Sequence, residues 1–337
     1  MFNWINKRTR RFKRNNELDQ YLEELTDILC SAENQLPVSK RNADCPVVFI
    51  VGPPRAGTTL LMQVIAQSGC FTYPTNFLSR FYGALEIGYK IQRILFDGQL
   101  QYRDELNLNQ QPLDFESDLG KTTGALSPNV FWYFWYHHFQ FGELSYLSKD
   151  QFHRSNTERF KHELARLYAV SSQPIAMKAM IINWNVLDFA GLLPNAVFLR
   201  VKRETPYVAN SIYEARKTVM GSYANWWSFK PPEFDQLKSL SPKEQVAGQC
   251  LSIEYALDEA FSKLKSTQKL ECHYEKICKN PQGFIDELCQ LMNAEDTDTN
   301  KVTYPRFSMS NSMDKALEDE WQTHLNQVAS KVSFASK

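Results

Sequence analysis

One short apolar run constrains the fold of this chain more than any other feature. The run ends in glycine and proline, and a pair of threonines follows shortly after. The run, Val47–Val51, is rich in β-branched residues, which is typical of a strand buried on both faces. Gly52 and Pro53 end it, and a helix is predicted from Thr58 because the next apolar residues recur at helical spacing. This order points backbone N–H groups and the positive end of a helix dipole at one spot. The sequence therefore predicts an anion-binding loop.

The side chains of this loop add further anion donors. Arg55 supplies a fixed positive charge with forked donors, and Thr58 and Thr59 supply hydroxyl groups. Gly57 lets the backbone approach a ligand without a Cβ in the way. The spacing from Gly52 to Gly57 is that of the ATP-binding pattern GxxxxGK[ST], but Thr58 stands where that pattern has lysine. An ATP-dependent P-loop phosphotransferase is therefore an alternative, although this chain lacks the phosphate-binding lysine of such enzymes at that position.

A second anion site is predicted where another strand ends. Residues 196–201 are expected to form a strand, which places Arg203 at its carboxyl end, where ligands of open α/β sheets bind. Ser211, eight residues later, falls about two turns into the following helix and can face the same point. Such a pair can hold a phosphate by charge-assisted hydrogen bonds. A surface arginine beside an unrelated helical serine is the alternative for this pair alone.

The rest of the chain alternates between strand and helix patterns, which favours a parallel α/β sheet flanked by helices. Further strands are expected at 175–180, 196–201 and 270–274, and helices at 17–36, 184–193, 206–219 and 281–292. The region of about 77–170 is aromatic and mostly helical, and we expect it to be a lid insertion over the sheet. The predicted division is a basic arm with an amphipathic helix (1–45), a main domain (46–295), and a C-terminal tail and helix (296–337).

The first loop resembles the 5′-phosphosulfate loop of sulfotransferases, P-[KR]-x-G-[TS]-T, in the segment Pro54-Arg55-Ala56-Gly57-Thr58-Thr59-Leu60. In that family an arginine that ends a strand and a serine eight residues later bind the 3′-phosphate of 3′-phosphoadenosine 5′-phosphosulfate (PAPS). Arg203 and Ser211 are similar to this pair. Weaker similarities are Met177-Lys178-Ala179, which resembles a strand with an inward lysine, and the segment from His273 to Pro281. The arginine in the first loop points to the bacterial-type or carbohydrate-acting branch of the family.

The resemblance implies a P-loop NTPase-like fold and a sulfotransferase that uses PAPS as co-substrate and no metal. The sulfuryl group would pass by in-line displacement to a hydroxyl of a carbohydrate or other small molecule, leaving adenosine 3′,5′-bisphosphate (PAP). Arg55 would stabilise the leaving oxygen, and Lys178 the sulfonate or bridging oxygens. The implied nucleotide-binding residues are Pro54, Arg55, Ala56, Gly57, Thr58, Thr59, Leu60, Arg203 and Ser211.

The sequence departs from the family pattern at the position of the general base. Many members carry a glutamate about twenty residues after the loop, but here Thr75 and Asn76 occupy that stretch, and neither takes a proton. Candidate bases in the insertion are Glu116, Asp118, His137 and His138. Solvated loop acids and a histidine pair at the edge of a core are the alternatives for these residues. A sulfotransferase-like scaffold that has lost catalysis is therefore a further alternative.

Composition limits the partners. The 38 basic and 38 acidic residues give a net charge of zero, so a general nucleic-acid coat is not expected. The apolar runs are shorter than the ~20 residues that span a bilayer, so no transmembrane segment is expected. The seven cysteines include no CxxC pair, so neither a disulfide framework nor a zinc site is expected. The basic start of the chain lacks the apolar stretch of a secretory signal, so we expect a cytoplasmic protein. A solvated end is expected for this arm, or else a surface arm that contacts anionic lipid or glycan.

Overall fold

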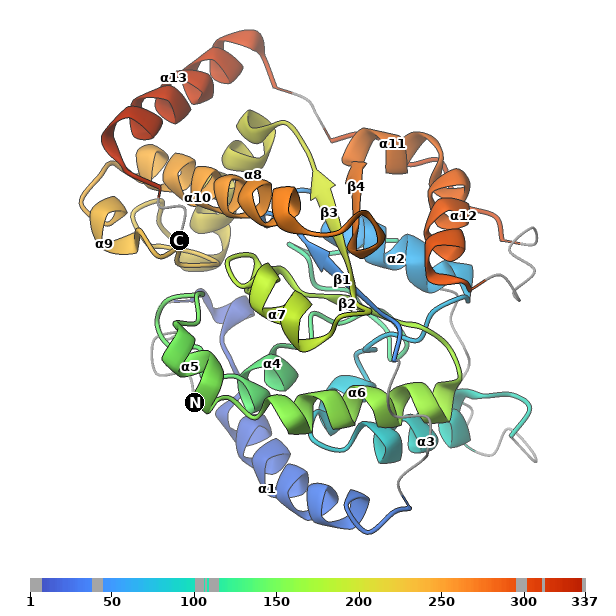
Figure 1. The fold of residues 1–337 in the computed structure, drawn as a ribbon. Helices are drawn as coiled ribbons and strands as arrows, with labels where there is room; N and C mark the ends of the chain where they lie inside the picture. Colours follow the sequence, from blue (N-terminus) through green and yellow to red (C-terminus); the bar gives the residue numbers. More distant parts are fainter. Residues whose placement is uncertain are drawn as a thin grey trace.

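Four parallel strands form the central sheet, as the sequence predicts (Figure 1). The computed structural model of the protein describes residues 8–37, 45–100, 106, 108, 115–294, 302–310 and 313–334. The strands are β1 (Val47–Val51), β2 (Ile175–Lys178), β3 (Val197–Lys202) and β4 (Lys269–His273), in the order β2-β1-β3-β4. β1 is central, because it pairs in parallel with both β2 and β3.

Helices cover both faces of the sheet, and the strand β1 is buried from both sides. Val47, Phe49 and Val51 face one apolar core, and Val48 and Ile50 face the other. The first core is covered by α1 (Asn16–Glu33), α3 (Leu85–Phe96), α4 (Trp132–His138), α6 (Thr157–Ser171) and α7 (Val186–Leu192). The second is covered by α2 (Thr58–Ser68), α8 (Thr205–Met220), α11 (Tyr274–Lys279), α12 (Pro281–Met292) and α13 (Lys315–Lys331). The remaining α-helices are α5 (Lys149–Arg154), α9 (Phe234–Leu237) and α10 (Pro242–Lys263), the last of which contributes to both cores.

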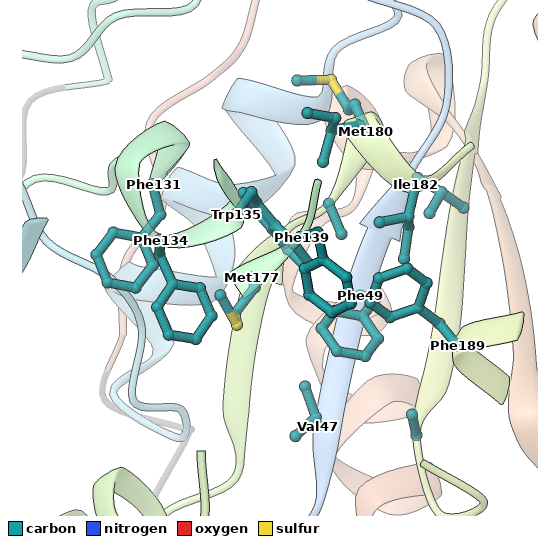
Figure 2. Close-up of a cluster of buried hydrophobic side chains, with 14 of the residues drawn as sticks. Val47, Phe49, Phe131, Phe134, Trp135, Phe139, Met177, Met180, Ile182 and Phe189 are labelled. Carbon is teal, nitrogen blue, oxygen red and sulfur yellow. The ribbon is translucent and has the colours of Figure 1, made fainter. Parts of the chain in front are cut away.

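The aromatic run of the insertion packs against the central strand. Phe131, Phe134 and Trp135 are buried, and the ring of Trp135 lies 6.0 Å from that of Phe49 on β1 (Figure 2). Side chains with large apolar areas stabilise such a core most, because burial removes more surface from water. Most of the run therefore forms core, while Trp132, at the start of α4, remains partly exposed.

The basic N-terminal arm does not run free into solvent over the residues that the structure describes. The backbone N–H of Thr9 donates to the carbonyl of Val219 at 2.8 Å, and the side chain of Phe12 is buried. The expectation of a solvated end is therefore wrong for residues 8–14, because one aromatic side chain anchors the segment. None of the described helices combines the length and apolarity needed to cross a membrane.

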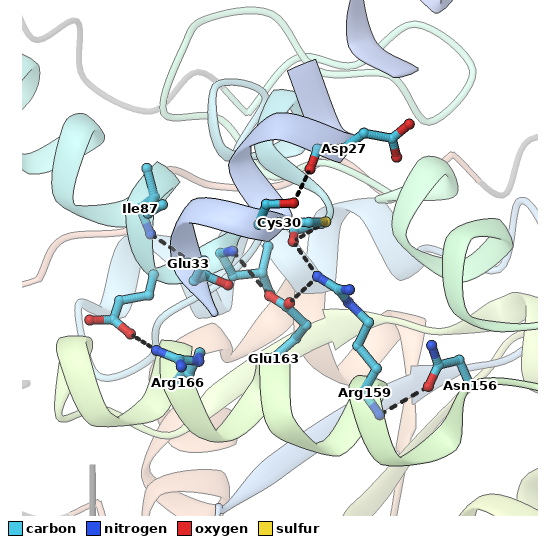
Figure 3. Close-up of polar contacts among 12 residues, drawn as sticks. Asp27, Cys30, Glu33, Ile87, Asn156, Arg159, Glu163 and Arg166 are labelled. Atoms are coloured by element: carbon cyan, nitrogen blue, oxygen red, sulfur yellow. Dashed lines mark hydrogen bonds and ion pairs between the residues drawn. The ribbon is translucent and has the colours of Figure 1, made fainter. Parts of the chain in front are cut away.

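Two buried carboxyl groups join α1, α3 and α6. Glu163 of α6 accepts a hydrogen bond from the backbone N–H of Leu85, and Glu33 of α1 accepts one from Ile87 (Figure 3). Both donors belong to the first turn of α3, which Ala84 does not cap with a side chain. Burial raises the pKa of both carboxyls, that of Glu163 to about 8, and the two interact directly. At neutral pH the pair therefore keeps a proton.

We expect this pair to make the protein less stable as pH rises. The folded-state pKa of Glu163 lies above its unfolded value, so the stabilisation is complete below about pH 4 and is lost as pH rises towards 8. Glu163→Gln should remove most of this loss, which is on the order of 2 kcal/mol. Urea denaturation at pH 5.5 and pH 8 measures it, with the exposed Glu158→Gln on the same helix as control. Equal pH dependence in wild type and Glu163→Gln would contradict the expectation.

Candidate functional site

A cavity of about 720 Å³ lies at the carboxyl edge of the sheet and is lined by residues that follow all four strands. The turn after β1 carries Arg55, β2 ends in Lys178, Arg203 follows β3, and Tyr274 follows β4. In parallel sheets the loops at this edge form the usual ligand site. The volume falls in the range of about 300–1,000 Å³ that is common for small-molecule sites.

The predicted anion loop has the expected local geometry. Helix α2 begins at Thr58, and Gly57 precedes it in the left-handed region with no side-chain cap on the helix. A Cβ on Gly57 would lie 2.5 Å from the ring of Tyr274, so only glycine fits here. Arg55 also has a positive φ of 71°, in the left-handed region that residues other than glycine seldom adopt. Of the predicted loop residues 54–60, all except the buried Ala56 line the cavity.

The two predicted anion sites are in direct contact. The Nε of Arg55 donates to the Ser211 hydroxyl at 3.0 Å, and the guanidinium of Arg203 donates to the backbone carbonyl of Arg55 at 2.9 Å. Arg203 lines the cavity and stacks on the ring of Tyr274 at 4.7 Å, whereas Ser211 stands behind Arg55 outside the lining. A serine hydroxyl that accepts from Arg55 still has its own O–H to donate.

Lys178 lies beside the start of α2. Its ammonium donates to the Thr59 hydroxyl at 2.8 Å, and its side chain is buried. Burial lowers the pKa of Lys178 to about 7, and the nearby positive charge of Arg55 adds to the effect. The amine is therefore only partly charged near neutral pH, and an anion placed beside it would raise its pKa again.

Asn183 is a site residue that sequence analysis missed. Its side-chain amide donates to the carbonyl of Gly52 and its amide oxygen accepts from the N–H of Gly52, each at 3.0 Å. Gly52 has a φ of 141°, and a Cβ there would lie 2.9 Å from the carbonyl of Val201. Asn183 thus fixes the residue at which β1 ends and the anion loop begins. No local signal predicts it, since 131 residues separate the partners.

A sulfotransferase family model matches residues 46–298, a span that contains the loop, Lys178 and the Arg203–Ser211 pair. The chain belongs to the sulfotransferase family. The fold is similar to that of the sulfotransferase STF1 from Mycobacterium tuberculosis, with a TM-score of 0.58 and 11% identity over 97% of this chain and 89% of that one. The sulfotransferase STF9 from Mycobacterium avium matches with a TM-score of 0.50 and 12% identity, over 92% and 81% of the two chains.

At these identities the likeness to the mycobacterial structures concerns the fold alone. No curated protein sequence matches the chain at a significant level. The resemblance to sulfotransferases that the loop and the Arg203–Ser211 pair indicate is confirmed by the family match, as is the P-loop-like parallel sheet by the fold.

This sulfotransferase closes one end of its cavity with a C-terminal segment that no motif predicted. Pro305, Arg306 and Phe307 line the cavity, and the guanidinium of Arg203 donates to the backbone carbonyl of Ser310 at 3.0 Å. The Tyr274 hydroxyl lies 3.3 Å from the Ser310 hydroxyl. The segment therefore rests on the same two side chains that border the anion loop.

The candidate bases separate into two groups. Glu116 and Asp118 lie in the loop that lines the cavity, and Asp118 forms an ion pair of 2.7 Å with Arg11 of the N-terminal arm. His138 does not line the cavity. It is 2% exposed among aromatic rings, neither ring nitrogen has a hydrogen-bond partner among the described residues, and burial places its pKa well below the usual value. His138 is therefore corrected from a candidate base to a core residue, and His137 likewise lies outside the lining.

The position where many relatives carry an acid has a structural role here. The side-chain amide of Asn76 donates to the carbonyl of Gly124 at 2.9 Å, and its oxygen accepts from Asn129 at 2.7 Å. Asn76 does not line the cavity. It holds the loop that follows Lys121 and takes no part in proton transfer. Within the ranges that the structure describes, no group of three or more His, Cys, Asp or Glu could hold a metal ion.

We expect Asn183→Ala to destabilise the protein by about 2–4 kcal/mol, because both polar groups of Gly52 lose their buried partner. The anion loop should also lose its fixed geometry, so affinity for PAP should fall together with stability. Urea denaturation and calorimetric titration with PAP measure the two effects. Asn326→Ala, on the exposed face of α13, is the matched control. A stable variant with unchanged affinity would show that Asn183 does not position the loop.

Proposed function

We propose that this protein transfers the sulfuryl group of PAPS to a hydroxyl of a carbohydrate or another small molecule. The observation that carries the proposal is the contact between the two anion sites through Arg55. PAPS bears anionic groups at its 5′ and 3′ ends, and one such nucleotide can reach both sites only if they share a cavity. The family and the lining of this cavity support the same donor.

The residues at the anion loop suit the 5′-phosphosulfate. Backbone N–H groups at the start of α2 and the side chains of Thr59 and Lys178 converge on one place, and Lys178 donates to Thr59 there. We assign the 3′-phosphate to Arg203 with the Ser211 hydroxyl, because a guanidinium pairs with phosphate through two parallel hydrogen bonds. Tyr274, on which Arg203 stacks, keeps that guanidinium in place.

Transfer then needs no covalent enzyme intermediate. The acceptor oxygen attacks sulfur in line, the bond from sulfur to the bridging oxygen breaks, and PAP leaves with the electron pair. Arg55 and Lys178 stabilise the charge that grows on the bridging oxygen and the sulfonate. The acceptor proton passes to a carboxylate, and Glu116 and Asp118 are the carboxylates among the described lining residues. Lys178 becomes fully charged as the anion binds, and a full positive charge stabilises the sulfonate and the bridging oxygen more strongly.

The two alternatives have less support. An ATP-dependent enzyme would need the lysine that Thr58 replaces, and the lysine that reaches the loop comes instead from β2. A scaffold without catalysis was suggested by the missing acid at Asn76, but the cavity offers two other carboxylates. Tighter binding of PAP than of ATP with Mg²⁺ would argue against the ATP-dependent enzyme. Formation of a sulfated product would argue against the scaffold without catalysis.

The test of the function is transfer of label from [³⁵S]PAPS to a panel of mono- and oligosaccharides and small alcohols. We expect Arg55→Ala to cost about 2–4 kcal/mol of transition-state stabilisation, which lowers kcat by roughly 30- to 1,000-fold. The exposed Arg80→Ala serves as the matched control. Label transfer by wild type and Arg55→Ala at the same rate would contradict the role of Arg55, and binding of PAP without any transfer would favour the scaffold.

Arg203 gives a second, independent measurement. Arg203→Ala should weaken binding of PAP by about 10- to 100-fold and that of AMP much less, because only PAP carries the 3′-phosphate. The neighbouring Lys202→Ala is the control, since Lys202 pairs with Glu271 and does not line the cavity. Equal losses for PAP and AMP in calorimetry would contradict the assignment of the 3′-phosphate.

A further inference from the structure

The cavity continues beyond the anion loop into a part that the nucleotide motifs do not explain. Gly120 lies directly over the reacting region, because a Cβ built on it would be 3.4 Å from the Thr59 hydroxyl and 4.0 Å from the Lys178 ammonium. The next residue, Lys121, lines the cavity and places its ammonium 5.5 Å from the ring centre of Phe12. The cavity therefore extends from Thr59 and Lys178 past Gly120 and Lys121 to the N-terminal arm.

The arm is fixed in this place by several contacts. Thr9 donates its backbone N–H to Val219 at 2.8 Å and its hydroxyl to the carbonyl of Thr218 at 3.1 Å. Arg11 pairs with Asp118 at 2.7 Å, and Asp118 forms two backbone hydrogen bonds with Lys121. The arm and the loop of residues 115–121 thus hold each other, and Arg8 and Phe12 become part of the lining.

The other walls of this part are apolar and aromatic. Trp132 and Phe229 line the cavity with their ring centres 5.7 Å apart, and Trp227 and Val219 also belong to its lining. Trp132 is 39% exposed, although the other aromatic residues of its helix start are packed into the core. Flat aromatic side chains in a cavity are suited to the face of a sugar or an aromatic ring.

Two cations, Arg8 and Lys121, line this part of the cavity, whose lining also holds the carboxylates of Glu116 and Asp118. Among the described residues neither Arg8 nor Lys121 forms an ion pair, and Asp118, whose charge acts on Lys121, already pairs with Arg11. Burial lowers the pKa of both Arg8 and Lys121, and the charge of Arg8 lowers that of Lys121 further. Two like charges held together in a partly buried place favour an anion between them.

We propose that this part of the cavity binds the acceptor, and that the acceptor is a ring-bearing hydroxyl compound with an anionic group that Arg8 and Lys121 bind. The ring rests on the side chains of Trp132 and Phe229, and its hydroxyl points towards Lys178. This inference rests on the proposed sulfuryl transfer and narrows the class of acceptor. A sugar acid and an aromatic hydroxy acid share the required chemistry, so the experiment compares both.

The experiment is calorimetric titration of the protein saturated with PAP. One arm compares methyl β-D-glucuronide with methyl β-D-glucoside, and the other compares 3-(4-hydroxyphenyl)propionate with its methyl ester. We expect at least one acid to bind about tenfold or more tightly than its neutral partner, the usual effect of a charge-assisted pair. In the double variant Arg8→Gln/Lys121→Gln this preference should disappear.

The matched control is Arg10→Gln/Lys13→Gln, which removes two exposed charges of the same arm that do not line the cavity. Its preference for the acid should persist, and both double variants should change PAP affinity to the same small extent. The inference is overturned if neither acid binds better than its neutral partner, or if the preference survives in Arg8→Gln/Lys121→Gln. Failure of PAP itself to bind would instead overturn the proposed function.

Discussion

The site depends on Arg55, a residue of the anion loop that contacts both members of the second anion site. The side chain of Arg55 donates to Ser211 of α8, and its backbone carbonyl accepts from Arg203 after β3. These contacts are possible because β1 and β3 are hydrogen-bonded neighbours in parallel register, so that both strands end at the same edge. Arg55 makes these contacts from a backbone with a positive φ of 71°. A fault in this register would separate the two segments even if each kept its local structure.

The cavity brings three buried or half-buried cationic side chains together. Burial lowers the pKa of Arg55, Lys178 and Arg203, and repulsion from Arg203 lowers that of Arg55 further. The free protein therefore carries an electrostatic cost that an anionic nucleotide relieves. A ligand that binds the folded chain and not the unfolded one would stabilise the fold. In the transfer that we propose, the same cations stabilise the charge of a departing phosphate oxygen.

Segments on both sides of the family match complete the walls of the cavity. Residues 46–298 supply the anion loop, Lys178 and Arg203, whereas Arg8, Phe12 and the segment 305–310 lie outside that span. The C-terminal segment rests on Arg203 and Tyr274, and the N-terminal arm rests on α8 and on the loop that carries Asp118. The core of the family domain thus holds the groups for the transfer, and the flanking segments shape the space on either side of it.

The sequence predicted those features that neighbouring residues determine. The strand, turn and helix start around Gly57 lie within about a dozen residues, and the eight-residue spacing of Arg203 and Ser211 follows from the pitch of one helix. The presence of Thr58 in place of the lysine of the ATP-binding pattern was also clear from the sequence, because the whole pattern lies within one short segment. Alternation of strands and helices gave the parallel sheet, because local apolar patterns reflect which faces are buried.

Tertiary structure alone decided the parts that join distant segments. Asn183 binds Gly52 across 131 residues, and Arg8 reaches the cavity only because Thr9 and Phe12 dock the arm. The histidine that the sequence offered as a base proved to be core, since the aromatic run turns that side of α4 towards Phe160. A pattern along the chain shows which side chains are apolar or charged. Which of them meet depends on how the elements pack, and packing is settled by the whole fold.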